Sequence, residues 1–120
     1  MKSDLEKKAI AILDASNDLA IATVRHDGFP QNTTVSFVHD GLTLFIGVGR
    51  DSQKARNMRR DPRVSLTVTP PYSDWDHIRG LSMAARATEM TTEEESAEIV
   101  GMMLKRFPQI ANMDPMEGIL

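Results

Sequence analysis

Basic residues gather in the stretch GVGRDSQKARNMRRDPRV, residues 47–64, although the whole chain carries a net charge of −3. Ser52 and Lys54 stand at the expected start of a helix within it. A helix N-terminus presents free backbone N–H groups and the positive end of the peptide dipoles, so it is a ready site for phosphate. Gly47 and Gly49 would let a ligand approach the preceding backbone closely. The stretch therefore predicts a phosphate site at a strand–loop–helix junction.

The same residues also have a simpler interpretation. Ser is a common N-cap in any helix, and Arg and Lys are good helix formers on a solvated face. On this view Arg56, Arg59 and Arg60 face solvent or pair with Glu side chains, and they bind no ligand. A nucleic-acid patch is a third interpretation, which the absence of interleaved aromatic residues disfavours.

Length and composition narrow the class of protein. A chain of 120 residues predicts one domain. It has no Cys, which excludes disulfides, Cys-ligated zinc, iron–sulfur clusters and a thiol nucleophile. No run approaches the ~18 apolar residues of a membrane span, and the N-terminus MKSDLEKKAI lacks the apolar core of a secretory signal. We therefore expect a cytoplasmic protein with no membrane partner and no nucleic-acid partner.

The first half of the chain reads as one helix followed by a meander of strands. Ser3 and Glu6 form a capping-box pattern at the start of a helix over residues 3–16. Apolar and β-branched runs separated by two Asp-Gly turns predict antiparallel hairpins. The expected strands are residues 19–25, 31–39 and 42–48.

The second half predicts two more helices and at least two more strands. A helix over residues 52–60 should stop before Asp61–Pro62, because the residue preceding a proline avoids the helical region. Short strands joined by tight turns favour a barrel, because closure removes unpaired edges. The remaining expected elements are strands at residues 63–69 and 77–90, a helix at residues 92–107, and the beginning of a sixth strand at Ile119–Leu120.

The order of these elements resembles a known family. The stretch DGFPQNTTVSFVHDGLTLFIGVGRDSQKARNMRRDPRVSLTV is similar to the pyridoxamine 5′-phosphate oxidase-like proteins, which are FMN-binding split β-barrels, and RGLSMAARATEM, residues 79–90, is similar to their long fifth strand. The resemblance implies one FMN-binding domain over residues 1–120. It would be mainly β with flanking helices, a six-stranded antiparallel split barrel whose last strand is cut short at Leu120. The matching positions are Gly28, Pro30, Val35, Asp40, Gly41, Ser52, Lys54, Asn57, Pro62 and Val64.

The resemblance also implies a homodimer with two FMN sites at the subunit interface. Ser52, Gln53 and Lys54 would hold the phosphate. Family members often have Arg where this chain has Gln53, so one phosphate cation would be missing, and Arg50 could substitute for it. The flavin would lie beside the strand that contains Asn32, Thr33, Thr34 and Val35. Gly47 and Val48 would flank it, and Trp75 and Arg79 would reach it from the partner subunit.

The expected function is that of an FMN-dependent oxidoreductase of unknown substrate, in which the flavin carries the redox chemistry. The C-terminal segment with which the oxidase holds its own substrate has no counterpart here, so that substrate is not expected. The alternatives are a deazaflavin- or heme-binding relative on the same barrel, and a non-catalytic flavin-binding dimer. His26, His39 and His77 show no short metal-ligand spacing, so no metal site is predicted.

Overall fold

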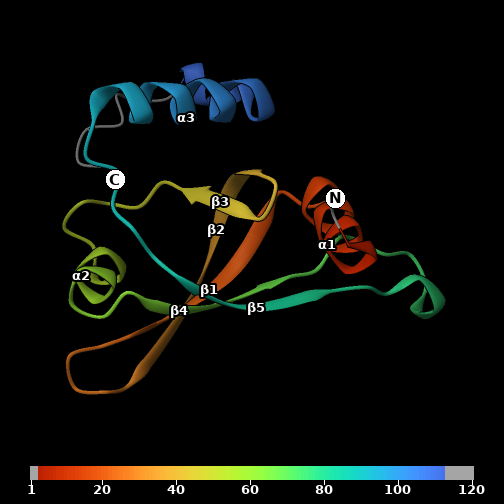
Figure 1. The fold of residues 1–120 in the computed structure, drawn as a ribbon, viewed down its shortest axis with the longest axis horizontal. Coiled ribbons are helices and arrows are strands. Elements are labelled where there is room, and N and C mark those ends of the chain that lie inside the picture. The colour runs from red at the N-terminus through yellow and green to blue at the C-terminus, as the bar shows by residue number, and fades with distance from the viewer. Residues whose placement is uncertain (1–2, 113–120) are drawn as a thin grey trace.

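The computed structural model describes residues 3–112, which form five strands and three α-helices. The strands form one antiparallel sheet in the order β3-β2-β1-β4-β5, and the sheet curls into a half-barrel between the helices (Figure 1). This confirms the mainly β split-barrel fold, with five strands in the described part; the predicted sixth strand lies outside it. The elements are α1 (Asp4–Asp14), β1 (Asp18–Val24), β2 (Pro30–Asp40), β3 (Thr43–Ile46), α2 (Gln53–Arg60), β4 (Arg63–Val68), β5 (Leu81–Arg86) and α3 (Glu93–Arg106).

Both predicted hairpin turns are present. Gly28 has φ +84° and Gly41 has φ +59°, a backbone region that glycine adopts without the steric penalty of a side chain. The first turn joins β1 to β2, and the second joins β2 to β3. The local turn chemistry therefore sets the meander of the first three strands.

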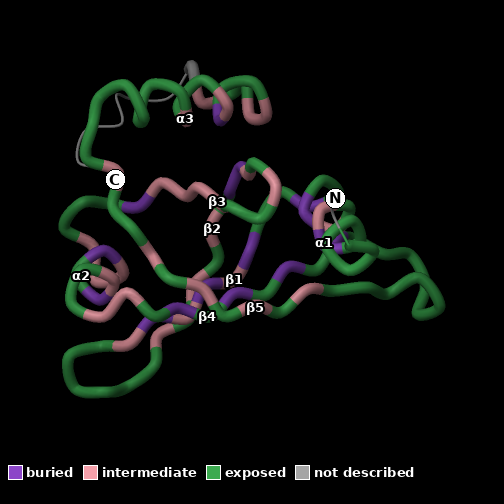
Figure 2. The backbone as a smooth tube through the Cα atoms, in the orientation of Figure 1, coloured by how far each residue is buried: buried purple, intermediate pink, exposed green. Residues whose placement is uncertain are grey.

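The core lies on the concave face of the curled sheet. β4 shows the alternation that the sequence predicts, because Val64, Leu66 and Val68 are buried while the residues between them are exposed. α1 adds Leu13, which is fully buried against this face. Figure 2 shows the buried backbone concentrated in β1, β4 and the bend of β2. The buried cluster consists of Leu13, Leu19, Ile21, Phe37, Val64, Leu66 and Val68.

α3 is attached to the rest of the fold through its last turn. Arg106 donates hydrogen bonds to the carbonyl oxygens of Leu13 and Ser16, at the C-terminal end of α1. Its guanidinium carbon also lies 5.4 Å from the centroid of the buried Phe37 ring, within cation–π range. A cation at a helix C-terminus is favourable because the last carbonyls carry partial negative charge.

The prediction of one long strand over residues 77–90 is wrong. β5 covers only Leu81–Arg86, and a short 3₁₀ turn occupies Trp75–His77. The reason lies in its partner strand, because β4 runs only from Arg63 to Val68 and is bounded by Pro62 and Pro70. A proline cannot donate a ladder hydrogen bond and has a fixed φ, so pairing stops near it.

Candidate functional site

The candidate site lies where β2 and β3 separate. β2 pairs with β1 through residues 30–36, but it pairs with β3 only through residues 37–40. After Ile46 the chain leaves the sheet and turns towards α2, while β2 continues along β1 (Figure 1). The second edge of residues 31–36 therefore has no partner strand among residues 3–112. Free backbone donors and acceptors on that edge are available to a ligand.

The predicted flavin-binding residues of β2 are divided between the two faces of the sheet. Asn32 and Thr34 lie on the exposed convex face, whereas Thr33 and Val35 turn towards the concave face. The Thr33 hydroxyl oxygen is buried and has no hydrogen-bond partner in the described part of the chain. One flat ligand cannot contact all four side chains, so any ligand beside this stretch would bind it mainly through the backbone.

Gly47 and Val48, predicted to belong to the third strand, instead follow the end of β3. They connect β3 to the turn that precedes α2, and Val48 is buried. They therefore stand between the open edge of β2 and the start of α2.

The first turn of α2 has two uncapped backbone donors. The Ser52 hydroxyl accepts a 3.1 Å hydrogen bond from the Ala55 N–H and donates a 2.6 Å bond to the Gly49 carbonyl oxygen. Among residues 3–112, no acceptor pairs with the N–H groups of Gln53 and Lys54. The first turn of α2 also holds no acidic residue. The positive end of this helix is therefore left uncompensated within the described chain.

Lys54 is the side chain of this turn with the strongest preference for an anion. It is half-buried, and burial lowers the pKa of its ammonium group. No carboxylate lies within 4 Å of it in the part of the chain that the structure describes. A partly desolvated cation without a counterion is unfavourable, and a bound phosphate would relieve that cost.

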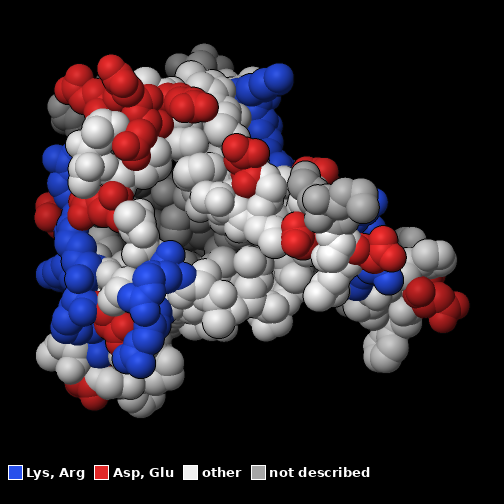
Figure 3. Space-filling model, in the orientation of Figure 1, with Lys and Arg blue, Asp and Glu red and all other residues white. Residues whose placement is uncertain are grey.

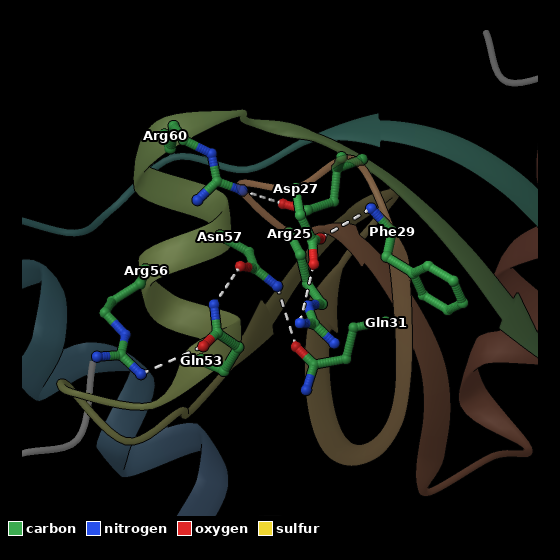
Figure 4. A network of polar contacts seen from close by, with 9 residues as sticks. Arg25, Asp27, Phe29, Gln31, Gln53, Arg56, Asn57 and Arg60 are labelled. Atoms are coloured by element: carbon green, nitrogen blue, oxygen red, sulfur yellow. Dashed lines mark hydrogen bonds and ion pairs between the residues drawn. The ribbon is translucent and has the colours of Figure 1, made fainter.

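The side-chain nitrogen of Gln53 takes part in a polar network (Figure 4). Its Nε2 donates a 2.7 Å hydrogen bond to Oδ1 of Asn57, which is completely buried. The Asn57 amide nitrogen in turn donates to the Thr23 hydroxyl and to the Gln31 Oε1, both at 3.0 Å. These bonds tie α2 to β1 and β2. Gln53 is therefore not free to turn its side chain towards a phosphate.

This network was not predicted from the sequence. The hydroxyl of Thr23, among the apolar residues that follow Asp18 in β1, is the one signal that could have indicated it, because a buried polar group needs a partner. The sequence indicated Asn57 only as a position that matches the family, with no role in the fold.

Trp75 and Arg79 do not lie near the other predicted residues of the same chain. They belong to the loop between β4 and β5, in which every residue from Pro71 to Gly80 is exposed, and Trp75 is 86% exposed. α2 precedes β4 and the loop follows it, and six extended residues span about 20 Å. Figure 1 shows them at opposite ends of the sheet. Within this chain, the loop and the start of α2 therefore lie apart.

The remaining basic residues around α2 are mostly paired, as the simpler interpretation expected. Arg59 pairs with Glu89 at 3.4 Å, and Arg60 donates to the Val24 carbonyl oxygen. Hydrogen bonds from Arg63 lower the pKa of Asp61 to about 2. On the face shown in Figure 3, Lys and Arg gather over α2 and the β1–β2 hairpin, and Asp and Glu gather over α3.

A separate apolar cavity of about 750 Å³ occupies the concave side of the half-barrel. It is lined by core side chains of β1, β3, β4 and β5, by Ala55 and Met58 of α2, and by the Arg59–Glu89 pair. Of the predicted site residues it contains only Val48, and its lining includes no His and no Tyr. This cavity is the interior of the barrel and is distinct from the open edge of β2.

Two of the three histidines already have hydrogen-bonded ring nitrogens. Both ring nitrogens of His39 are engaged, Nε2 with the Asp14 carboxylate at 2.8 Å and Nδ1 with the Gly41 carbonyl oxygen at 3.0 Å. His77 is exposed and pairs with Asp74. Residues 3–112 bring together no cluster of three or more potential metal ligands. Within the same residues, no helix has the length and hydrophobicity to span a bilayer.

Three known proteins are similar to this chain, one of them in sequence and two in structure. General stress protein 26 of Bacillus subtilis is 29% identical over 67 residues, which are 56% of this chain and only 47% of that protein. A Listeria innocua structure provisionally assigned as a pyridoxamine 5′-phosphate oxidase has a TM-score of 0.74 and 28% identity, over 87% of this chain and 81% of the other. The heme storage protein HutZ of Vibrio cholerae has a TM-score of 0.79 and 20% identity, over 98% and 86% of the two chains, and so shares the fold.

The model of one protein family covers almost the entire sequence. The pyridoxamine 5′-phosphate oxidase model matches residues 5–119, a range that contains the curled sheet, all of α2 and the open edge of β2. This agrees with the resemblance that the sequence indicated, which covered roughly residues 5–107. The chain belongs to the pyridoxamine 5′-phosphate oxidase family.

Proposed function

We propose that this protein binds FMN at the interface of a homodimer and acts as an FMN-dependent oxidoreductase. The observation that carries the proposal is Lys54, a half-buried cation with no carboxylate partner among the described residues, beside two uncapped N–H groups of α2. Family membership supports a phosphorylated flavin as the anion that occupies this position.

The first turn of α2 offers the hydrogen-bond donors that a phosphate needs. The phosphate would accept from the N–H groups of Gln53 and Lys54 and from the Lys54 ammonium group. The Ser52 hydroxyl already donates to Gly49, so its main part is to cap the helix and hold the turn. The open edge of β2 would orient the ring system. When bound, the flavin supplies the hydride chemistry, and the protein supplies binding, orientation and electrostatics.

The convex face of the sheet supports a dimer. Directly opposed residues in antiparallel strands point to the same side, and the register gives this face two rows of short side chains. Short side chains on this face allow a second sheet to approach closely, and a second copy would bring the Trp75 loop towards α2 of its partner. The rows are Thr34, Ala20, Thr67 and Ser82, and Asn32, Ala22, Ser65 and Ala84.

Heme and deazaflavin are the alternative cofactors. HutZ, which has the same fold, is named as a heme storage protein. In this chain, however, both ring nitrogens of His39 are engaged, and the described lining of the barrel cavity has no His or Tyr. Of the side chains that serve as axial heme ligands, this lining offers only methionines, Met58, Met83 and Met90. This favours a flavin.

Absorption spectroscopy with equilibrium dialysis tests the proposal directly. The purified protein is dialysed separately against FMN, riboflavin, a deazaflavin and heme, and bound ligand is measured. We expect FMN to be retained in preference to riboflavin, one molecule per chain. Retention of heme with a Soret band, or of the deazaflavin alone, would overturn the FMN assignment. Turnover of NADH or NADPH by the FMN-loaded protein separates an enzyme from a non-catalytic flavin-binding dimer.

A further inference from the structure

The side-chain amide of Gln53 has a defined orientation. Asn57 uses its amide nitrogen to donate to Thr23 and Gln31, so only its Oδ1 is available to Gln53. An oxygen accepts, so Gln53 must present its NH₂ group inward, as the 2.7 Å contact between Gln53 Nε2 and Asn57 Oδ1 shows. The Oε1 of Gln53 is then turned away from the buried part of the network (Figure 4).

That outward oxygen holds a cation. Arg56 Nη2 lies 3.3 Å from Gln53 Oε1 and donates to it. Side chains of an α-helix lean towards its N-terminus, so an arginine at the fourth helical position reaches back over the first turn. The Arg56 guanidinium therefore lies on the turn that carries Lys54 and the two uncapped N–H groups. A guanidinium has five N–H donors, and one bond to Gln53 leaves donors for a phosphate.

We propose that Arg56, positioned by Gln53, is the second cation that binds the FMN phosphate in this protein. The inference rests on the proposed function, because it concerns the same phosphate. It assigns two roles: Arg56 contacts the phosphate, and Gln53 is a positioning residue that acts through Arg56. The buried amide of Asn57 sets the orientation of Gln53 and thereby links the fold to the ligand site.

This arrangement explains how the chain functions with Gln at position 53. Family members often have Arg at position 53. Here the cation is Arg56, three residues later in α2, and the Gln53 side chain holds it on the first turn. Arg50 is the competing source of charge, since it precedes α2 in the connecting turn. The Arg50 carbonyl oxygen accepts a hydrogen bond from Arg59, and this bond anchors the Arg50 backbone. The bond does not involve the Arg50 guanidinium group.

Affinities for FMN and riboflavin, measured by flavin fluorescence titration, test the first role. Riboflavin has the same ring system and no phosphate, so the ratio of the two affinities isolates the phosphate contacts. We expect Arg56→Gln to weaken FMN binding by about tenfold, as loss of one partly exposed charge-assisted hydrogen bond would do. Riboflavin binding should not change. Arg60→Gln is the matched control, because it makes the same charge change at the other end of the same helix.

A double-mutant cycle tests the positioning role. Gln53→Ala alone should weaken FMN binding by less than Arg56→Gln does. In the Arg56→Gln background it should have no further effect, because Gln53 then has no cation to position. Urea denaturation of each variant shows whether it is folded. Additive losses in the cycle would show that Gln53 acts independently and would overturn its role.

The outcomes separate this inference from the proposed function. If the wild-type protein binds neither flavin, both are wrong. If Lys54→Ala selectively weakens FMN but Arg56→Gln matches Arg60→Gln, the phosphate site stands and the role of Arg56 is wrong. If Arg50→Gln gives the selective loss and Arg56→Gln does not, Arg50 is the second cation and the inference is also wrong.

Discussion

The side-chain nitrogen of Asn57 on α2 donates a 3.0 Å hydrogen bond to the hydroxyl of Thr23 on β1, and both residues are buried. The two residues lie 34 positions apart in the sequence, so this bond fixes the helix on the sheet rather than stabilising either element alone. Because the proposed phosphate site lies at the N-terminal end of α2, one turn before Asn57, the position of that site depends on this contact.

Substitution of Asn57 should be strongly destabilising. Asn57→Ala leaves the polar groups of Thr23, Gln31 and Gln53 without their partner and opens a cavity, so we expect the free energy of unfolding to fall by about 2–4 kcal/mol. Thr23→Val keeps the volume and removes one partner, and should cost about 1–2 kcal/mol. Urea denaturation measures both. Equal small losses from the two variants would contradict a central role for Asn57.

Lys54→Ala should weaken FMN binding selectively. Loss of a charge-assisted hydrogen bond to phosphate predicts an increase in Kd of between about 10- and 100-fold. Riboflavin has no phosphate, so its Kd should barely change. Arg59→Ala is the control, because Arg59 pairs with Glu89 rather than with a ligand. If both variants weaken FMN equally, or if riboflavin is affected as much as FMN, α2 is only a basic helix.

The preference for FMN over riboflavin should decline at alkaline pH. Burial lowers the pKa of Lys54 below its ordinary value of 10.5, and only the protonated ammonium group attracts phosphate. As the pH rises through that lowered pKa, Lys54 loses its charge and FMN binds more weakly. FMN and riboflavin have the same ring system, so any titration of the ring changes both affinities equally and leaves their ratio unchanged. Lys54→Arg should keep the ratio constant over the same range, because arginine stays charged; a parallel decline in that variant would exclude Lys54 as the cause.

The emission of Trp75 should report on the dimer. Trp75 is the only Trp in the chain and is 86% exposed, far from α2 of its own subunit. If a partner brings it to the flavin, saturating FMN should quench its emission, and riboflavin should do the same because the ring is the quencher. Sedimentation at micromolar concentration should give the mass of a dimer. A monomer that binds FMN, or unchanged emission at saturation, would remove Trp75 from the site.

Asp61 should contribute to stability at moderate pH and lose that contribution in acid. Its side chain accepts hydrogen bonds from Arg63, which lowers its pKa from 3.8 to about 2. A carboxylate with a lowered folded-state pKa stabilises the native state above its unfolded-state pKa, and this stabilisation is lost as the pH falls from about 4 towards 2. Denaturation series between pH 5 and pH 2 should therefore show a shallower acid limb for Asp61→Asn. Arg63→Gln should have the same effect; an unchanged limb in both variants would contradict the pairing.

The local elements could be predicted from the sequence because their causes are local. Gly28 and Gly41 adopt positive φ, which sets the two hairpins, and Ser52 caps α2 where the sequence indicates. Pro62 follows the end of the helix. Each of these features depends on the conformational preference of one residue and its neighbours. The family resemblance then identified the strand arrangement that these elements adopt.

The tertiary structure decided which of these features meet. The length of β5 is set by its pairing with β4. The sequence of β5 alone could therefore not predict where the strand begins and ends. Gln53, expected at the phosphate, turns inward because buried Asn57 offers it an acceptor, and burial of Asn57 depends on a strand that lies far away in the sequence. Helical periodicity gives the face on which a side chain lies, but not what that face contacts. The contacts that orient Gln53 and Arg56 therefore exist only once α2 lies against β1 and β2.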